Sequence, residues 1–385
     1  MKSPVVESKV LANLKPLVVA GGEEGGLEYL AGDGVESGVV SWRSRRLRSE
    51  EQVNQDSAGV DPETATLVLA DGAGAVSHSE WLSGNVVRRV INGCREAVGV
   101  GLQVSGAKNG DMYDVLMDAF LREAVKDCMP ATRLYESRMV TTVNVMKYFE
   151  DNGALGPCVK AWNLGDSHGF VIDRESRSFS YRSFPDVPPI YTFLKKYFKP
   201  GMNDEEKRGV IKEMMKKGMV RKRTDGSYRG PLPDAVCREA VWTYLGVVGE
   251  IRLEHLIEFF TRFHVQSHIL QKFLRVVPGW SDDQQFFDFR PIQVPVESGN
   301  VCLAMSDGAA VWFSDADVLD IVCSAKTARE GVKNLMWQIR DRQREVMEKD
   351  WSLYDLGGRH LDGEFQVKLH KNFLDDTTLA WMVVP

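Results

Sequence analysis

The sequence predicts an α+β fold that is built from short antiparallel strands and a few long helices. Between residues 141 and 184, short apolar runs are separated by tight polar loops, which is typical of antiparallel strands. Two other segments, 80–98 and 111–128, repeat their apolar residues at helical spacing. With 385 residues, of which 43% are hydrophobic, the chain is long enough for one large domain or two modest ones.

The chain begins with its least regular part. Residues 1–36 are rich in glycine and glutamate, and they predict an irregular lead-in that has room for one short strand. A strand is expected at 38–42, and it runs into the basic cluster RSRRLR at 43–48. The apolar run at 67–70 predicts a buried strand that ends at Asp71.

The next part of the chain supplies the predicted core. The helical segments 80–98 and 111–128 should each turn one apolar side toward the core. Tight loops join the strand-like runs that follow, so neighbouring strands should pair antiparallel. These runs are TTVNVMKYF at 141–149, CVKAWNLGD at 158–166, GFVIDR at 169–174 and SFSYRSF at 178–184.

The pattern changes between about residues 183 and 290. This stretch is dense in charge and also holds apolar helical segments, so it predicts an insertion or a flap-like subdomain. Within it, 207–223 mixes eight basic residues with acidic ones, which indicates a solvated amphipathic helix. After it, the sequence predicts a strand in NVCLAMSDG at 300–308, a helix at 327–348 and a last strand in TLAWMVV at 378–384.

Composition argues against several classes of function. A net charge of −6 and an isoelectric point near 5.8 argue against a nucleic-acid-binding protein. No signal-like amino terminus and no uncharged stretch of about 18 residues is found, so we expect a cytoplasmic protein without a membrane span. Six cysteines lie in apolar surroundings without a CxxC pair, and we expect them to be reduced core residues.

Carboxylates stand at the ends of predicted strands in four places. Asp71 follows the run LVLA, Asp307 follows the strand in 300–308, and Asp375 precedes the last strand. Asp56 lies fifteen residues before Asp71, close enough for a neighbouring strand. A charge at the end of a core strand must be paired or bound to a cation, and carboxylates suit Mg²⁺ or Mn²⁺ better than zinc. For Asp71 alone, the alternative is a turn residue that caps the next helix.

Five motifs carry a resemblance to a known family. NQDS, VLADGAG, NLGDS, LAMSDG and DDTT, in this order, resemble the signatures of the metal-dependent protein phosphatases of type 2C, the PPM family. The first motif reads NQD in place of the commoner NED, and in this respect it is closest to bacterial members of the family. The resemblance covers about residues 37–182 and 291–385. It implies one PPM-type domain at 37–385, which the insertion at 183–290 interrupts. In the fold that it implies, two antiparallel sheets pack as a sandwich between helices (αββα), and a two-metal centre lies at one edge of the sandwich.

The resemblance also implies roles for single residues. Asp71 matches the carboxylate that bridges both metals, and Gly72 matches the glycine whose carbonyl contacts one of them. The other expected ligands each match one further motif, and they are Asp307, Asp375 and Asp56. Asp166, in NLGDS, matches a position that holds a weaker third metal in some members, and the alternative is a loop residue that caps a turn.

The chain departs from the family pattern at several positions. Gln55 stands where many members have Glu, and Glu51 replaces the usual phosphate-binding Arg. Arg46 or Arg48 could supply the missing cation, or both could be surface residues. His78 arrives seven residues after Asp71, later than the histidine of many eukaryotic members, and could act as a general acid, cap the helix or lie on the surface.

Two weaker signals point elsewhere. His264 and His268 stand four residues apart, which could place both imidazoles on one helix face for zinc. Neither an adjacent glutamate nor a third ligand accompanies them, so exposed or packed histidines are favoured. Val140 replaces the glycine that usually precedes the paired threonines, a change that should affect packing more than chemistry.

Taken with the resemblance, the residues predict a serine/threonine phosphoprotein phosphatase with two Mg²⁺ or Mn²⁺ ions. A water activated by the ions would attack phosphorus in line, and no phosphoenzyme would form. The expected partners are phosphoserine or phosphothreonine proteins with a cognate kinase, and neither nucleic acid nor a membrane is expected. The alternatives are a catalytically silent binding module of the same family and a metal-dependent hydrolase of small phosphate esters.

Overall fold

Two sheets and the helices beside them make up most of the described part of the chain. The computed structural model describes residues 16–19, 28–32, 35–42, 54–72, 78–100, 107–135, 139–150, 156–183, 202–216, 221–222, 224, 228–229, 274–276, 290–310, 312–348 and 376–385. The chain divides into two compact units, of which the first covers 1–185, 272–342 and 375–385 and the second covers 186–271 and 343–374.

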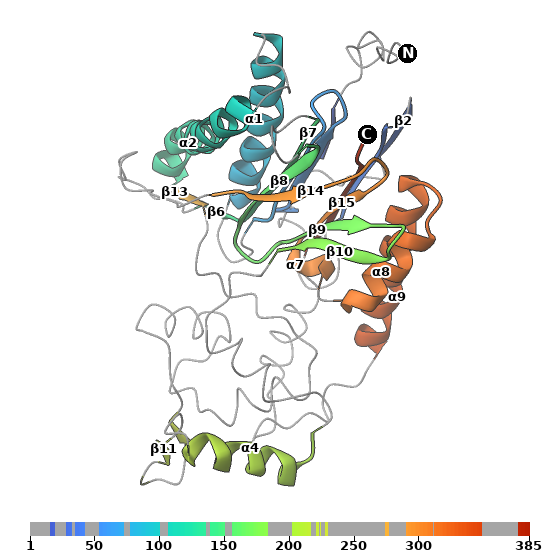
Figure 1. The fold of residues 1–385 in the computed structure, drawn as a ribbon. Coiled ribbons are helices and arrows are strands. Elements are labelled where there is room, and N and C mark those ends of the chain that lie inside the picture. The colour runs from blue at the N-terminus through green and yellow to red at the C-terminus, as the bar shows by residue number, and fades with distance from the viewer. Residues whose placement is uncertain are drawn as a thin grey trace. The chain divides into compact units, whose positions relative to one another are not determined.

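The first unit contains two six-stranded antiparallel sheets (Figure 1). In spatial order, the first sheet consists of β1 (Leu17–Val19), β4 (Ser57–Asp61), β5 (Thr66–Ala70), β7 (Val143–Phe149), β8 (Cys158–Leu164) and β14 (Ile292–Pro295). The second sheet consists of β10 (Ser178–Arg182), β9 (His168–Asp173), β15 (Val301–Met305), β16 (Thr377–Val383), β3 (Val35–Trp42) and β2 (Glu28–Gly32).

The sheets pack face to face, as three apolar clusters indicate. Along β5, Leu67 and Leu69 belong to an inner cluster that also holds Ala304 and Met382 of the second sheet. Alternate residues of β5, such as Val68, point outward to the helices instead. Because both faces of β5 are covered, the strand reads as a continuous apolar run rather than an alternating one.

Helices cover the outer face of each sheet (Figure 1). On the first sheet lie α1 (Ser79–Gly99) and α2 (Ala107–Tyr135). These two helices pack closely at Gly93, where an added Cβ would come within 2.3 Å of the Phe120 ring. On the second sheet lie the short α7 (Asp307–Ala310), α8 (Asp315–Ser324) and α9 (Ala328–Glu348). The predicted αββα sandwich is therefore confirmed.

Side chains fix where α8 and α9 begin. Ser314 and Asp317 form a capping box, in which each side chain accepts a hydrogen bond from the backbone amide of the other. The amide of Ala328, at the start of α9, donates to the Glu36 carboxylate at 2.7 Å. A residue of β3 thus satisfies a donor at the first turn of a helix that lies almost three hundred residues later in the chain.

The lead-in and the insertion differ from the sequence-based picture in detail. The stretch 1–36 contributes β1 and β2 to the two sheets, so part of it is regular. At the other end of the predicted insertion, β13 (Leu274–Val276) pairs with β6 (Met139–Thr141) in the first unit. The apolar side chains of Leu274 and Val276 are buried beside α2, which gives this short strand its place.

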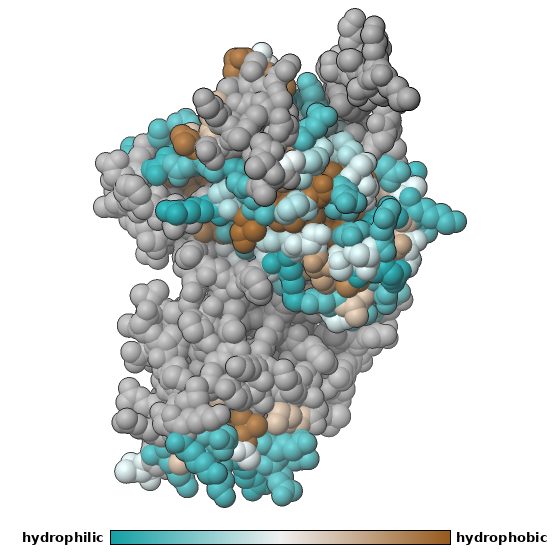
Figure 2. Space-filling model, viewed as in Figure 1, coloured by the Kyte–Doolittle hydropathy of each residue, from teal (hydrophilic) through white to brown (hydrophobic). Residues whose placement is uncertain are grey.

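The second unit contains α4 (Asp204–Lys216) and the strands β11 (Arg221–Lys222) and β12 (Tyr228–Arg229). Only Ile211 and Met214 are buried along α4, and Figure 2 shows hydrophilic side chains over this helix. The predicted solvated amphipathic helix is therefore found in the described part of 207–223.

Other predictions are tested only in part. Five cysteines of the described residues have free thiols, and Cys237 lies outside those residues. His264 and His268 also lie outside them. Among the described helices, none is both long and apolar enough to cross a membrane.

Candidate functional site

Asp56 and Asp71 lie side by side at one end of the first sheet. In the antiparallel pairing of β4 with β5, Ser57 is opposite Ala70. The next pair in the same register is Asp56 and Asp71, just beyond the ends of both strands. The apolar strands place these two carboxylates together because they stop at the same level.

The second sheet places carboxylates at its own edge in the same way. Met305, the last residue of β15, is opposite His168 of β9 and Leu379 of β16. Asp307 therefore follows the end of β15 that lies beside the start of β9. Counted two residues beyond the Met305–His168 pair, Asp307 is level with Asp166. The loop of NLGDS and the end of LAMSDG therefore lie at the same end of the second sheet.

Two hydrogen bonds join these edges across the sandwich. The backbone amide of Asp307 donates to Asp71 Oδ2 at 3.3 Å, although the two residues are 236 positions apart. The amide of Gln55 donates to Asp376 Oδ2 at 2.9 Å. Both bonds connect the first sheet's edge to the second sheet's edge, so the four strand ends form one acidic edge of the sandwich.

Two threonines hold the backbone of Asp71. The Asp71 carbonyl accepts hydrogen bonds from the Thr142 amide at 2.8 Å and from the Thr141 hydroxyl at 2.9 Å. The Asp71 amide in turn donates to Thr142 Oγ1 at 3.2 Å. Thr142 Oγ1 also shares a hydrogen bond with Ser167 Oγ at 2.6 Å, which connects the NLGDS motif to Asp71. These bonds fix the backbone of Asp71 without using its carboxylate.

Gly72 lies against the NQDS motif. It forms an isolated antiparallel bridge with Thr141. A Cβ on this residue would come within 2.5 Å of the Gln55 carbonyl oxygen and 2.9 Å of the Gln55 Cβ, closer than real Cβ atoms approach. A glycine is therefore required for these two motifs to touch.

The donor set suits a hard divalent cation. Asp56, Asp166 and Asp307 are all more than nine-tenths buried, whereas Asp71 is partly exposed. Buried carboxylates need compensating partners, and an all-oxygen set favours Mg²⁺ or Mn²⁺ over softer metals. Among the described residues, however, no three His, Cys, Asp or Glu side chains lie close enough together to hold a metal ion. Asp375, an expected ligand, lies outside the described residues.

His78 stands at the N-cap position directly before α1, but its side chain does not cap the helix. The residue has a left-handed backbone with φ of 67°, and its side chain makes no capping hydrogen bond. The ring stacks on Trp81 at 4.6 Å between centroids and contacts Tyr135 at 4.9 Å. Of the three roles that the sequence left open, the structure therefore does not support capping through the side chain.

The expected phosphate-binding arginines lie outside the described residues. Arg46 and Arg48 follow β3, which ends at Trp42 opposite Thr377. Since Thr377 adjoins Asp376, β3 ends at this acidic edge. The sequence position of the two arginines is thus compatible with the site, and their own placement is not described.

Sequence reasoning missed two residues that hold the site together. Asp376, beside the expected ligand Asp375, is buried and accepts the Gln55 amide. Ser167 is buried and bonds Thr142. The signals for them were present, since each stands directly after a predicted ligand in DDTT and NLGDS, but proximity in sequence does not tell which of two neighbours faces the site.

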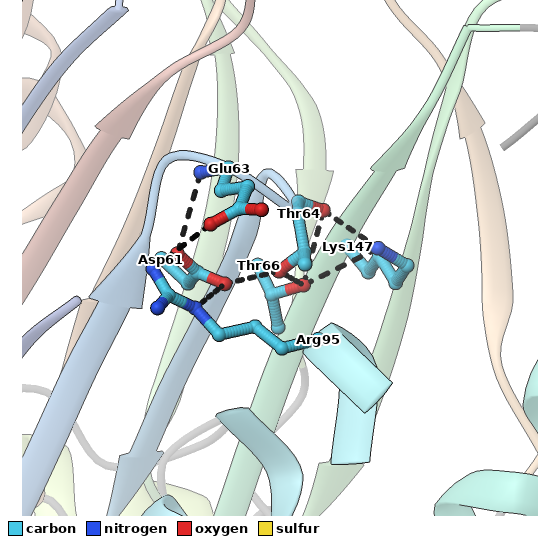
Figure 3. Close-up of polar contacts among 6 residues, drawn as sticks. All are labelled: Asp61, Glu63, Thr64, Thr66, Arg95 and Lys147. Carbon is cyan, nitrogen blue, oxygen red and sulfur yellow. Dashed lines mark hydrogen bonds and ion pairs between the residues drawn. The ribbon is translucent and has the colours of Figure 1, made fainter. Parts of the chain in front are cut away.

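A second buried polar cluster lies at the opposite end of β5 (Figure 3). Asp61 accepts two hydrogen bonds from the Arg95 guanidinium, at 2.8 and 2.9 Å. Lys147 Nζ donates to the Thr64 carbonyl at 2.6 Å. Thr66 begins β5 and Asp71 follows its end, so this cluster is separated from the acidic edge by the length of the strand.

Comparisons with known proteins give structural likenesses only. No family model matches the chain, and no curated protein matches it. The solved structure of the serine/threonine phosphatase PstP/Ppp of Mycobacterium tuberculosis is 12% identical in sequence to this chain and has a TM-score of 0.46. The match covers 91% of this chain and 98% of that chain. The PPM Ser-Thr phosphatase MsPP of Mycobacterium smegmatis, in complex with cacodylate, is 16% identical with the same TM-score and the same coverage.

A further solved structure is the catalytic domain of PstP in complex with two manganese ions. It is 14% identical, has a TM-score of 0.45, and the match covers 91% of this chain and 99% of that chain. One of these proteins is named a PPM phosphatase, the family that the five motifs resemble. At this level of likeness the neighbours carry no argument about the activity of this chain.

Proposed function

We propose that the chain is a serine/threonine phosphoprotein phosphatase that depends on Mg²⁺ or Mn²⁺. The observation that carries this proposal is the 3.3 Å hydrogen bond from the Asp307 amide to the Asp71 carboxylate, which joins two of the five motifs across the sandwich. The bonds of Gln55 to Asp376 and of Thr142 to Ser167 attach the other motifs to the same edge. Five motifs that resemble a phosphatase family in sequence are thus neighbours in space.

The residues proposed to hold the ions offer oxygen atoms at this edge. Asp71 would bridge two ions, Asp166 would serve a weaker third one, and the remaining donors would be the Gly72 carbonyl, Asp56, Asp307 and Asp375. When bound, such a pair of ions supplies an activated water and offsets the charge that develops on the phosphoryl oxygens.

The chain's own residues would prepare this edge for the substrate. Thr141 and Thr142 fix the Asp71 backbone, so the carboxylate needs little reorganisation when it acts. An acidic edge repels a phosphate dianion, and we propose that Arg46 or Arg48 supplies the attraction. His78 is proposed to donate a proton to the departing serine or threonine oxygen.

We further propose that residues 183–290 select which phosphoproteins are dephosphorylated. This stretch matches none of the five motifs, and most of it belongs to the second compact unit. Its charged helix α4 offers a hydrophilic surface of both signs, of the kind that can discriminate between protein substrates. The substrates are proposed to be cytoplasmic phosphoproteins that a cognate kinase modifies.

Phosphate release from a phosphothreonine peptide, with and without added Mn²⁺, tests the proposal. Release that requires Mn²⁺ and stops on chelation is the expected result. Turnover of small phosphate metabolites but not of the peptide would instead support the hydrolase of small esters. No turnover of the peptide, the metabolites or an aryl phosphate would contradict catalysis and support the silent binding module.

A further inference from the structure

Two described residues, Gly72 and Ser79, both contact β6. Gly72 pairs with Thr141, and the Val140 amide donates to Ser79 Oγ at 3.2 Å. Because Val140 and Thr141 are adjacent, the start of α1 is anchored one residue away from the strand position that holds Asp71. His78, directly before Ser79, is thereby brought to the neighbourhood of the acidic edge.

The ring of His78 is held in place from two sides. Trp81 stacks on it with an interplanar angle of 18°, and Tyr135 of α2 closes against both rings. A left-handed backbone is unusual for a histidine and costs roughly 1–2 kcal/mol. The surrounding contacts must offset this cost, and side chains that are held in strained conformations cluster at functional sites.

Glu80 gives the ring a third contact. Its Oε1 lies 3.5 Å from His78 Nδ1. The residue is only 7% exposed, and its Oε2 has no hydrogen-bond partner among the described residues. A buried carboxylate is costly unless it is compensated, and the His78 imidazole lies beside this one. About a third of the His78 side chain remains exposed, so the ring is accessible from outside.

From this geometry we propose that Glu80 is a positioning residue that orients His78 as the proton donor of the reaction. The inference rests on the proposed phosphatase function. The carboxylate lies beside Nδ1 and so fixes which way the ring faces, as in other carboxylate–histidine pairs. The second ring nitrogen, Nε2, is then the one that serves the substrate.

The proposed step balances in protons and electrons. Water oxygen forms a bond to phosphorus while the bond from phosphorus to the serine or threonine oxygen breaks. The departing oxygen keeps the bonding electron pair and takes the proton from His78 Nε2. The attacking water gives up one proton to solvent, and the imidazole regains one from solvent.

Substrates with different leaving groups test the role of Glu80. An alkoxide from phosphoserine needs a proton as it departs, whereas 4-nitrophenolate does not. We therefore expect Glu80→Gln to lower kcat on a phosphoserine peptide about 10–100-fold more than on 4-nitrophenyl phosphate, the usual range for a lost carboxylate behind a functional histidine. KM for the peptide should stay the same. The matched control is Glu96→Gln, an exposed glutamate on the same helix, which should change neither substrate.

A second variant separates positioning from folding. His78→Asn keeps a residue that tolerates the left-handed backbone, and it should show the same selective loss. If Glu80 acts through His78, the double variant should be no slower on the peptide than His78→Asn alone. Equal losses on both substrates, or losses that multiply in the double variant, would overturn the inference while leaving the phosphatase proposal intact. A wild-type protein that hydrolyses neither substrate would refute the phosphatase proposal and this inference together.

Discussion

Lys147 on β7 and Lys160 on β8 lie directly opposite each other, and both side chains are fully buried. Lys160 Nζ reaches the Asp114 carboxylate of α2 at 3.2 Å. Lys147 Nζ instead donates to the Thr64 carbonyl and lies over the Tyr113 ring at 4.9 Å. Burial lowers the pKa of Lys147 from its ordinary value, and the neighbouring Cys94 and Asp61 only partly oppose this effect.

We expect Lys147→Met to stabilise the fold at pH 7. Methionine has a similar length and no charge to desolvate, and the Thr64 carbonyl keeps the Thr66 hydroxyl as a donor. Replacing buried charge by a hydrophobic side chain is commonly neutral or stabilising, so the free energy of unfolding should rise by roughly 1–3 kcal/mol. Chemical denaturation measures it, and Lys126→Met, at an exposed ion pair on α2, is the control.

The pH dependence gives a second measurement on the same pair of proteins. Because the pKa of Lys147 is lower in the folded state, the unfolded chain binds more protons, and wild-type stability rises with pH toward the ordinary lysine pKa of 10.5. Lys147→Met lacks this rise, so its advantage should shrink between pH 7 and pH 9. The buried Cys94 thiol, whose pKa burial raises, affects stability only above about its ordinary value of 9.0. A constant advantage across this range would contradict the lowered pKa.

The two lysines also illustrate what the sequence could and could not predict. Alternation along TTVNVMKYF places Lys147 on the same face as Val145, which is buried, but a charge at that position argues for an exposed face. Only the helix packed over the sheet supplies the Asp114 and Tyr113 contacts that make burial possible. Helical and strand periodicity is local, and it predicted α1 and α9 to within about one residue at each end.

Long-range pairing was the harder part to predict. The acidic strand ends were found from the sequence because each follows an apolar run. Their bonds to one another, such as Gln55 to Asp376 over 321 positions, depend on sheet register, which the sequence does not state. β13 was missed for the same reason, because three apolar residues become a strand only when β6 pairs with them. Glu80 was overlooked because an acidic residue in the first turn of a helix is ordinary.

Gly72→Ala should weaken both the fold and the site. The new Cβ would meet the Gln55 carbonyl at 2.5 Å, so the NQDS segment must move away from Asp71. Overpacking of this kind costs about 1–3 kcal/mol, and metal-dependent turnover should fall with it. Thermal melting and turnover on one sample measure both effects. Gly99→Ala, where nothing lies within 4 Å of the new Cβ, is the control and should be neutral or slightly stabilising. An active and equally stable Gly72→Ala protein would contradict the close approach.

Removing a proposed phosphate-binding cation should act on substrate binding. We expect Arg46→Ala or Arg48→Ala to raise KM for a phosphopeptide about tenfold, because a lost charge-assisted hydrogen bond is worth about 1.5–3 kcal/mol. Steady-state kinetics with saturating Mn²⁺ separate KM from kcat. Arg88→Ala, an exposed arginine on α1, serves as the control. Unchanged kinetics in both variants would mean that the cation lies elsewhere in the chain.

Asp71→Asn should abolish turnover without unfolding the protein. The backbone of Asp71 is held by Thr141 and Thr142 through its carbonyl and amide, and neither bond uses the carboxylate. An asparagine can still accept the Asp307 amide through its side-chain oxygen. Without metal, carboxylates gathered at one edge repel one another, so removing one charge should leave the melting temperature equal or higher.

The same substitution is diagnostic because the two roles of an aspartate at a strand end predict opposite results. If Asp71 bridges two ions, no other ligand replaces it, and activity is lost even at high Mn²⁺. Asp307→Asn and Asp375→Asn, each expected to serve one ion, should keep weak activity at high Mn²⁺. If Asp71 only stabilised the turn before α1, its loss would cost about 0.5–2 kcal/mol and leave turnover intact. The melting temperature without metal and the Mn²⁺-dependent turnover distinguish these outcomes. The control is Asp320→Asn, a substitution at an exposed surface residue. A destabilised but active Asp71→Asn protein would rule out the two-metal assignment.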